Sequence, residues 1–207
     1  MSSFDKLVTY FEKFPGVGIR QARRFTYHLL KLRPQEIGEI SELIKNLSAS
    51  VGECHDCHRF FTKRLASDVL CDICSNHTRN HQQLLIVAND SDITALERSG
   101  LYHGYYFVLG GLAPLLETKN NNRLRSGALK ALVEKKLATD LREVILGFAV
   151  SPDGENTGRY VRSLLNDYHR PTGEELHFSE LGRGLSTGSE LEYADPETLK
   201  NALRNRT

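Results

Sequence analysis

The residues best suited to chemistry in this 207-residue chain are its four cysteines, which form two Cys-x-x-Cys pairs. Cys54 pairs with Cys57 and Cys71 with Cys74, and 13 residues separate the pairs. Two such turns around a short loop can bring four thiolates to one ion, which is the ligand set of a tetrahedral zinc site. Because four sulfur ligands leave no position for water or substrate, we expect one structural zinc ion.

Other interpretations of the cysteines stay open, namely two disulfides, four unrelated buried thiols or an iron–sulfur cluster. Nothing in the sequence suggests an oxidising compartment, and the spacing is closer to a zinc ribbon. The intervening segment 59–70 has too few apolar residues for a core, so metal binding would supply its folding free energy. Nearby histidines are expected to lie at the surface or beside the site; they are His55, His58, His77 and His81.

The bulk composition, 40% hydrophobic and 26% charged, is that of an ordinary soluble protein. The length allows one large domain, or two small ones plus a zinc module. The first residues carry charges throughout and no long apolar run. We therefore expect neither a signal peptide nor a membrane span, and a location in the cytoplasm, where thiols stay reduced.

The net charge of +1 gives no indication of nucleic-acid binding, but the distribution of charged residues along the chain does. Between residues 13 and 33 there are basic residues and no acidic ones. The basic residues are Lys13, Arg20, Arg23, Arg24, Lys31 and Arg33. Such an asymmetry indicates an N-terminal region that faces a polyanion.

Apolar spacing predicts three helices in the same region. The apolar stripe of the first is Phe4, Leu7, Val8 and Phe11. The inward-facing residues expected on the second helix are Ala22, Phe25 and Leu29. The third, over residues 34–49, is expected to bury Ile37, Ile40, Ile44 and Leu47.

The first two helices are joined by Phe-Pro-Gly-Val-Gly at residues 14–18, the pattern of a helix–hairpin–helix. Its glycines permit a tight turn and let backbone N–H groups approach a phosphate. Arg20 and Arg24 are four residues apart and share a helix face, with Tyr27 alongside. The residues expected to contact a DNA backbone, without reading its sequence, are Lys13, Arg20, Arg23 and Arg24. The alternative is a helical hairpin with a solvated basic face.

The second half of the chain alternates apolar strands with helices. Strands are predicted at residues 84–87, 105–109, 144–148 and 176–181. Helices are predicted at 92–99 and 123–137, and a turn at 151–155 leads into a helix that runs through Tyr168. The alternation implies a parallel sheet with right-handed crossovers, whose ligand-facing residues lie at the carboxyl ends of the strands.

Acidic residues follow two of these strands. Asp90 and Asp92 come after the first strand, next to Asn89, and Asp153 and Glu155 come after the third. Such acids could hold a divalent cation through oxygen ligands. The alternative, which needs no metal, is that Asp92 and Asp153 cap helices and form turns.

The order of these parts resembles the bacterial RecR family of recombination mediators over nearly the whole chain. The hairpin F-P-G-V-G-I-R-Q-A-R-R is similar to that family's L-P-G-V-G-P-K-S-A-Q-R, and L-L-I-V-A-N-D-S-D with Y-Y-F-V-L-G-G resembles its Toprim domain. The C-terminal R-G-L-S-T-G-S-E-L-E-Y-A-D-P is close to the family's ending. The resemblance implies an α/β protein of several modules. They are a helix–hairpin–helix at 1–52, a four-cysteine zinc module at 53–80, a Toprim-like parallel-sheet domain at 81–176 and a C-terminal assembly segment of strand and helix at 177–207.

The resemblance also implies a non-enzymatic role in DNA repair. RecR proteins form rings, usually tetramers built from dimers, and act with RecO and RecF to load RecA onto single-stranded DNA. By position, Arg20 and Arg24 match the basic DNA-contacting residues of the family, and the four cysteines match its zinc ligands. Asp153 and Glu155 fall on an acidic turn that contacts a partner protein in the family.

Three departures from the family pattern stand out. Ala88 occupies the position where the family usually has a glutamate, and a Toprim enzyme needs an acid there beside its metal. We therefore expect no catalysis and no Mg²⁺ in the Toprim-like domain. Segment 117–122 replaces a loop of the family. Arg20 replaces a lysine, which keeps the charge and changes the geometry towards phosphate.

Two other functions compete with this interpretation. A Toprim metal-dependent nucleic-acid enzyme would use the acids named above, and a partner-binding adaptor would not bind DNA by itself. The glycine-rich segment 182–188 lacks the Gly-Lys-[Ser/Thr] ending of a P-loop, so we expect a structural turn. In the RecR family this region supports assembly between subunits, and the resemblance implies the same role here. Asp195 and Pro196 are expected to cap and begin a final helix.

Overall fold

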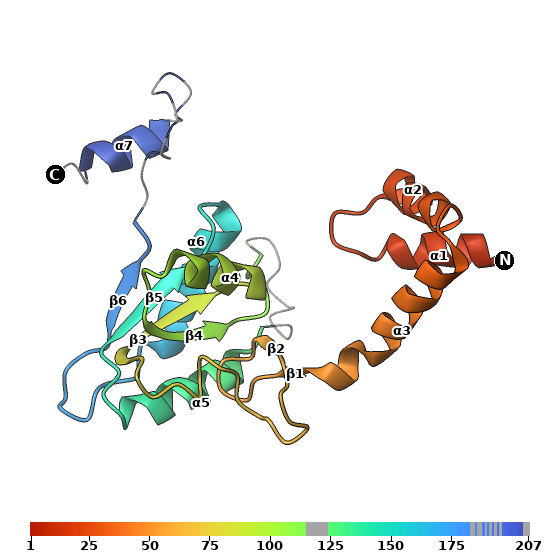
Figure 1. The fold of residues 1–207 in the computed structure, drawn as a ribbon. Coiled ribbons are helices and arrows are strands. Elements are labelled where there is room, and N and C mark those ends of the chain that lie inside the picture. The colour runs from red at the N-terminus through yellow and green to blue at the C-terminus, as the bar shows by residue number, and fades with distance from the viewer. Residues whose placement is uncertain are drawn as a thin grey trace. The chain divides into compact units, whose positions relative to one another are not determined.

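The computed structural model describes residues 1–114, 124–182, 185, 188, 190, 192, 194 and 196–204 (Figure 1). Two compact units make up the chain, Met1–Val51 and Gly52–Thr207. The predictions for segment 117–122, for most of segment 182–188 and for Asp195 lie outside the described residues.

The first unit contains three helices, α1 (Ser3–Phe11), α2 (Ile19–Leu29) and α3 (Pro34–Ser50). A capping box starts α1, because Ser2 Oγ accepts a hydrogen bond from the Asp5 N–H at 3.2 Å and Asp5 Oδ2 accepts one from the Ser2 N–H at 3.1 Å. Gly16 has a φ of 73°, which a glycine adopts without strain in the turn before α2. The helices α1 and α2 pack against each other around Val8, Ala22 and Thr26.

The predicted inward faces of the second and third helices are partly wrong. Ala22 is buried as expected, but Phe25 is 44% exposed, although its ring meets that of Phe11 edge-on. On α3 the four residues predicted to be buried are between 38% and 68% exposed, and no residue of this fully described helix is buried. They are Ile37, Ile40, Ile44 and Leu47. A unit of this size buries only a small fraction of its surface. Apolar periodicity shows which side chains of α3 share a face, but it does not show whether another element packs against that face.

The second unit is built on a parallel sheet in the order β4-β3-β5-β6. Its strands are β3 (Asn80–Val87), β4 (Gly104–Val108), β5 (Glu143–Gly147) and β6 (His177–Glu180). In the register, Leu85 of β3 lies between Tyr106 of β4 and Ile145 of β5. The apolar half of β3 is fully buried, as expected for a strand covered on both faces. The predicted parallel sheet is therefore confirmed.

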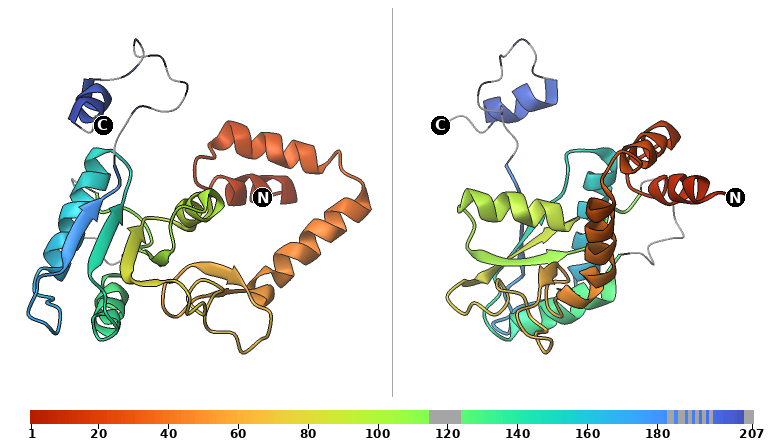
Figure 2. Two further views of the ribbon diagram at one scale, coloured as in Figure 1. Left: turned by 60° about the vertical axis from the view of Figure 1, so that its left-hand side comes forward. Right: turned by 45° about the vertical axis from the view of Figure 1, so that its right-hand side comes forward.

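Helices cover both faces of this sheet (Figure 2). On one face lies α4 (Asp90–Ser99), and on the other lie α5 (Ser126–Leu137) and α6 (Pro152–Leu165). The last helix, α7 (Pro196–Arg204), begins at the proline predicted to start it. Of the helices in the described residues, none is long and apolar enough to span a membrane.

The predicted turn at residues 151–155 is wrong in its extent. Ser151 is the N-cap of α6, and its Oγ accepts a hydrogen bond from the Gly154 N–H at 3.1 Å. Pro152 therefore begins the helix, where its fixed φ and missing N–H cost nothing. The helix ends at Leu165, before the Tyr168 of the prediction. Asp153 and Glu155 consequently lie in the first helical turn.

Candidate metal centre and basic surface

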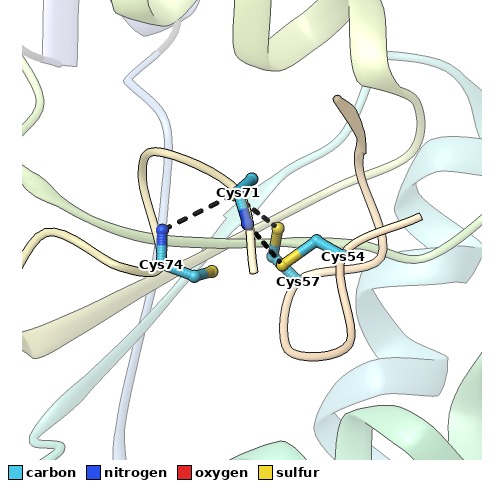
Figure 3. A group of neighbouring side chains, drawn as sticks. All are labelled: Cys54, Cys57, Cys71 and Cys74. Carbon is cyan, nitrogen blue, oxygen red and sulfur yellow. Dashed lines mark hydrogen bonds between the residues drawn. The ribbon is translucent and has the colours of Figure 1, made fainter. Parts of the chain in front are cut away.

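The four cysteines come together in two turns that precede the sheet (Figure 3). Cys54 and Cys57 lie between the short paired strands β1 (Val51–Glu53) and β2 (Phe60–Thr62), and Cys71 and Cys74 follow the loop after β2. All four are buried, and their sulfur atoms lie within 4.8 Å of one another. A tetrahedral site with Zn–S bonds of about 2.3 Å has sulfur atoms about 3.8 Å apart, so the arrangement can hold a metal ion.

Hydrogen bonds within the cluster fix the sulfur atoms. The Cys71 N–H donates to Cys54 Sγ at 3.4 Å, and the Cys74 N–H donates to Cys71 Sγ at 3.5 Å. Cys57 Sγ and Cys71 Sγ are 3.6 Å apart, far beyond the length of about 2.05 Å of a disulfide. All four cysteines are free, so the disulfide alternative is wrong for this structure.

The chemistry of the donor set also fits a cation. The hydrogen bond between Cys54 and Cys57 lowers the pKa of the first thiol and raises that of the second, and burial adds to the second effect. Several thiolates at this distance repel one another, which disfavours the loss of all four protons without a cation. A divalent cation would replace those protons with a charge that all four sulfur atoms share.

The neighbouring histidines lie outside this ligand group, which in the described residues is formed by cysteines alone. His58 Nδ1 lies 2.7 Å from Glu53 Oε1, and its backbone N–H closes the first turn by donating to the Cys54 carbonyl at 2.9 Å. His81 packs its ring against Tyr105. These contacts agree with the expectation of groups at the surface or beside the site.

The four-cysteine cluster is docked on the parallel sheet. The Val108 N–H, at the end of β4, donates to the Cys57 carbonyl at 2.8 Å. Lys135 Nζ of α5 lies 2.9 Å from Asp56 Oδ1. Beside it, Lys136 is buried with its Nζ 3.5 Å from the centre of the Tyr105 ring. Burial lowers the pKa of this ammonium group, and the nearby Cys74 acts in the opposite direction.

A second anchor joins the centre to the far side of the sheet. Arg79, directly before β3, contacts both oxygens of Glu97 in α4, at 3.0 and 2.6 Å. The Tyr106 hydroxyl donates to the same carboxylate at 2.7 Å. Sequence reasoning missed this network and Lys136, because the partners are far apart in the chain and no local spacing reveals them.

The two acidic residues that follow β3, Asp90 and Asp92, form hydrogen bonds with backbone N–H groups. The Asp92 carboxylate accepts a hydrogen bond from the Asn89 N–H at 2.9 Å and caps α4. Asp90 Oδ1 accepts one from the Phe60 N–H at 2.7 Å and so ties β2 to α4. In the described residues these acids form no metal-ligand group with Asp153 and Glu155. The capping alternative is therefore correct for Asp92.

The structure places the predicted DNA-contacting residues at two positions in the first unit. Arg20 and Arg24 are exposed on the side of α2 away from the buried Ala22, and Arg23 is exposed on its flank. Lys13 follows α1, with its Nζ 5.0 Å from the centre of the Tyr10 ring. None of these four cations forms an ion pair with a carboxylate of the described residues. Their charge is thus available to an anion.

Together these features define a multi-module α/β protein in which a basic helical hairpin precedes a four-cysteine centre docked on a parallel sheet. A family model described as RecR, C-terminal, matches residues 184–207. The chain is 36% identical over 203 residues to recombination protein RecR of Prochlorococcus marinus subsp. pastoris. The aligned residues cover 98% of this chain and 94% of that protein. The chain is 32% identical over 202 residues to the RecR protein of Flavobacterium johnsoniae, covering 98% and 91%. The chain therefore belongs to the RecR family of recombination proteins, which confirms the resemblance found in the sequence.

Proposed function

We propose that this protein is a non-catalytic, DNA-binding mediator of recombinational DNA repair. In this proposal it forms a ring- or clamp-like oligomer in the cytoplasm and acts with RecO, RecF or both to promote RecA loading on single-stranded DNA. The observation that carries the proposal is the exposed face of α2, where Arg20, Arg23 and Arg24 pair with no carboxylate of the described residues. The similarity to RecR proteins over the full chain supports it.

The modules of the proposal are those expected from the sequence. Residues 1–52 bind DNA, 53–80 hold one structural zinc ion through the four cysteines, 81–176 form the Toprim-like domain and 177–207 support assembly. Asp153 and Glu155, at the start of α6, are proposed to contact the protein partner. The buried, four-sulfur geometry of the centre supports a structural ion.

Removing two cations of the α2 face tests DNA binding. The double variant Arg20→Ala/Arg24→Ala is expected to bind DNA at least tenfold more weakly at low salt. Two lost phosphate contacts should also reduce the slope of log K against log salt by about 2. Fluorescence anisotropy with a labelled oligonucleotide at several salt concentrations measures both quantities.

The matched control removes two exposed cations from the second unit, in the variant Arg98→Ala/Lys130→Ala. It is expected to keep both the affinity and the salt slope. Unchanged DNA binding by a folded Arg20→Ala/Arg24→Ala variant would refute the assigned surface. If the unaltered protein binds its protein partners but no DNA at low salt, the adaptor function replaces the proposal.

The residues that follow strand β3 support the proposal that the protein is not a catalyst. Ala88 is buried at the position where a Toprim enzyme needs an acid. The carboxylates of Asp90 and Asp92 accept hydrogen bonds from backbone N–H groups. Mg²⁺-dependent cleavage or priming of a nucleic acid that disappears in an Asp153→Ala variant would overturn this part of the proposal.

Assembly is supported by the exposed apolar stripe of α3. Ile40, Leu43, Ile44 and Leu47 repeat at helical spacing along one side of the helix and are 38%, 65%, 68% and 60% exposed. A row of large apolar side chains on a helix favours burial against another surface. A second copy of the chain supplies the same stripe, which suits an isologous contact.

Placing a charge on this stripe is expected to break the oligomer. In Ile44→Glu, association would bury an unpaired carboxylate, so the dissociation constant should rise at least tenfold. Light scattering coupled to size-exclusion chromatography measures the mass over a range of concentrations. The control Ala49→Glu adds the same charge to the opposite, exposed side of α3 and should leave the mass unchanged. A mass for Ile44→Glu equal to that of the unaltered protein would remove α3 from the proposed interface.

A further inference from the structure

The basic face of α2 contains an aromatic side chain in line with its cations. Arg20, Arg24 and Tyr27 of α2 follow one another at intervals of four and three residues, which keeps them near one side of the helix, and Lys31 comes two residues after the end of α2. Arg20 and Arg24 lie opposite the buried Ala22 and Thr26, and Tyr27 lies on the flank next to them. Tyr27 is 57% exposed in the middle of the row.

The surface around Tyr27 is hollowed. A cavity of about 510 Å³ is lined by Gln21, Arg24, Phe25, Tyr27, His28 and Lys31. It thus combines two aromatic rings with cationic groups and hydrogen-bonding side chains. Neither Arg24 nor Lys31 forms an ion pair with a carboxylate of the described residues.

The Tyr27 ring is held in place from one side. The ring of Phe4 in α1 lies 4.9 Å from it, centre to centre, at an interplanar angle of 53°. A ring supported in this way loses little conformational freedom on binding a ligand. Its exposed surface is available for stacking.

The chemistry of this row selects one form of nucleic acid. Contacts with phosphates need only the cations, and in a duplex the bases are stacked and paired inside. In a single strand the bases are free to stack on aromatic side chains while basic groups follow the backbone. An aromatic ring between cations therefore suits a single strand better than a duplex.

We propose that Tyr27 is a stacking platform for a base of single-stranded DNA, with Arg24 and Lys31 holding the phosphates on either side. This inference rests on the proposed DNA-binding function of α2 and names the strand form that the face prefers. Arg24 lies in α2 and Lys31 lies two residues after its end, and both line the same cavity as Tyr27. Tyr27 lies between them.

The test compares two substitutions of the same residue in the full-length protein. Tyr27→Leu keeps an apolar contact for Phe4 but removes the stacking surface, whereas Tyr27→Phe keeps the ring. Anisotropy is measured with a labelled oligothymidylate of 20 nucleotides and with a duplex of the same length. Tyr27→Leu should bind the single strand about tenfold more weakly, with duplex affinity changed less than twofold, and Tyr27→Phe should match the unaltered protein.

A second measurement does not depend on a folded variant. Ultraviolet crosslinking of a single strand containing 5-iodouracil to the unaltered protein should yield a labelled peptide that contains Tyr27. The same modified base within a duplex should not crosslink there. A single-strand crosslink confined to other peptides contradicts the stacking platform.

The outcomes separate this inference from the function on which it rests. If the unaltered protein binds no DNA, the proposed function fails and the inference fails with it. If binding depends on Arg20 and Arg24, but Tyr27→Leu has no effect or weakens single strand and duplex equally, only the inference is overturned. The same holds if Tyr27→Leu changes the mass of the oligomer and leaves single-strand affinity intact, because Tyr27 then belongs to a protein interface.

Discussion

Replacing Cys71 by serine is expected to abolish metal binding and to unfold the four-cysteine centre. Cys71 is fully buried, lies 3.6 Å from Cys57 Sγ and accepts a hydrogen bond from the Cys74 N–H. A serine hydroxyl does not replace a thiolate ligand at neutral pH, so the ion loses one of its four bonds. Structural zinc contributes about 10–16 kcal/mol to folding in small peptides, and a loss of several kcal/mol is expected here.

The damage should spread beyond the centre. The Val108 N–H donates to the Cys57 carbonyl, and the Asp90 carboxylate of α4 accepts a hydrogen bond from the Phe60 N–H. When the turns that carry these groups unfold, β4 loses a hydrogen-bond partner at its end and α4 loses its tie to β2. Thermal unfolding of the Cys71→Ser variant should therefore begin at least 10 °C lower, an amount that about 4 kcal/mol produces in a domain of this size.

The matched control is His55→Ala, which alters an exposed residue directly beside Cys54. Elemental analysis should find about one zinc ion per chain in the control and in the unaltered protein, and none in Cys71→Ser. A chelator should lower the melting temperature of the unaltered protein towards that of the cysteine variant. Full zinc content and unchanged melting in Cys71→Ser would rule out Cys71 as a ligand.

Replacing Gly154 by alanine should destabilise the α/β unit strongly, although the change adds one methyl group. A Cβ at this position would overlap the Ala149 carbonyl oxygen and lie 3.0 Å from the Ala149 carbonyl carbon. Both are backbone atoms in the turn that enters α6, so no side-chain rotation relieves the overlap. The first turn of α6, with Asp153 and Glu155, would have to move, at a cost of about 3 kcal/mol.

Gly158, one turn further along α6, provides the matched control. A Cβ there would have Leu146 Cδ1 as its nearest neighbour at 3.7 Å, an ordinary van der Waals contact. Alanine is also favoured over glycine inside a helix by up to about 1 kcal/mol, so Gly158→Ala should be neutral or stabilising. Urea unfolding followed by circular dichroism compares the two variants. Equal stabilities would show that the turn before α6 adapts to a side chain at residue 154.

Some of these features could be predicted from the sequence because they depend on local spacing. Two Cys-x-x-Cys turns bring their own thiols together, and the structure places all four sulfur atoms within 4.8 Å. The run from Leu84 to Val87 has no polar face, so only a strand covered on both sides accommodates it. The resemblance to RecR proteins was also visible in short motifs, and relatives that match nearly the whole chain confirm it.

Tertiary structure decided what each exposed or buried group contacts. The sequence offered Asp90 as a possible metal ligand and Asp92 as either a ligand or a helix cap. The role of Asp90 depends on Phe60, whose N–H donates to Asp90 Oδ1 at 2.7 Å across 30 residues of chain. Likewise, apolar periodicity identified the stripe of α3 correctly but predicted wrongly that Ile44 and Leu47 are buried. Periodicity determines which side chains share a face, because it follows from helix geometry, whereas burial depends on the elements that pack against that face.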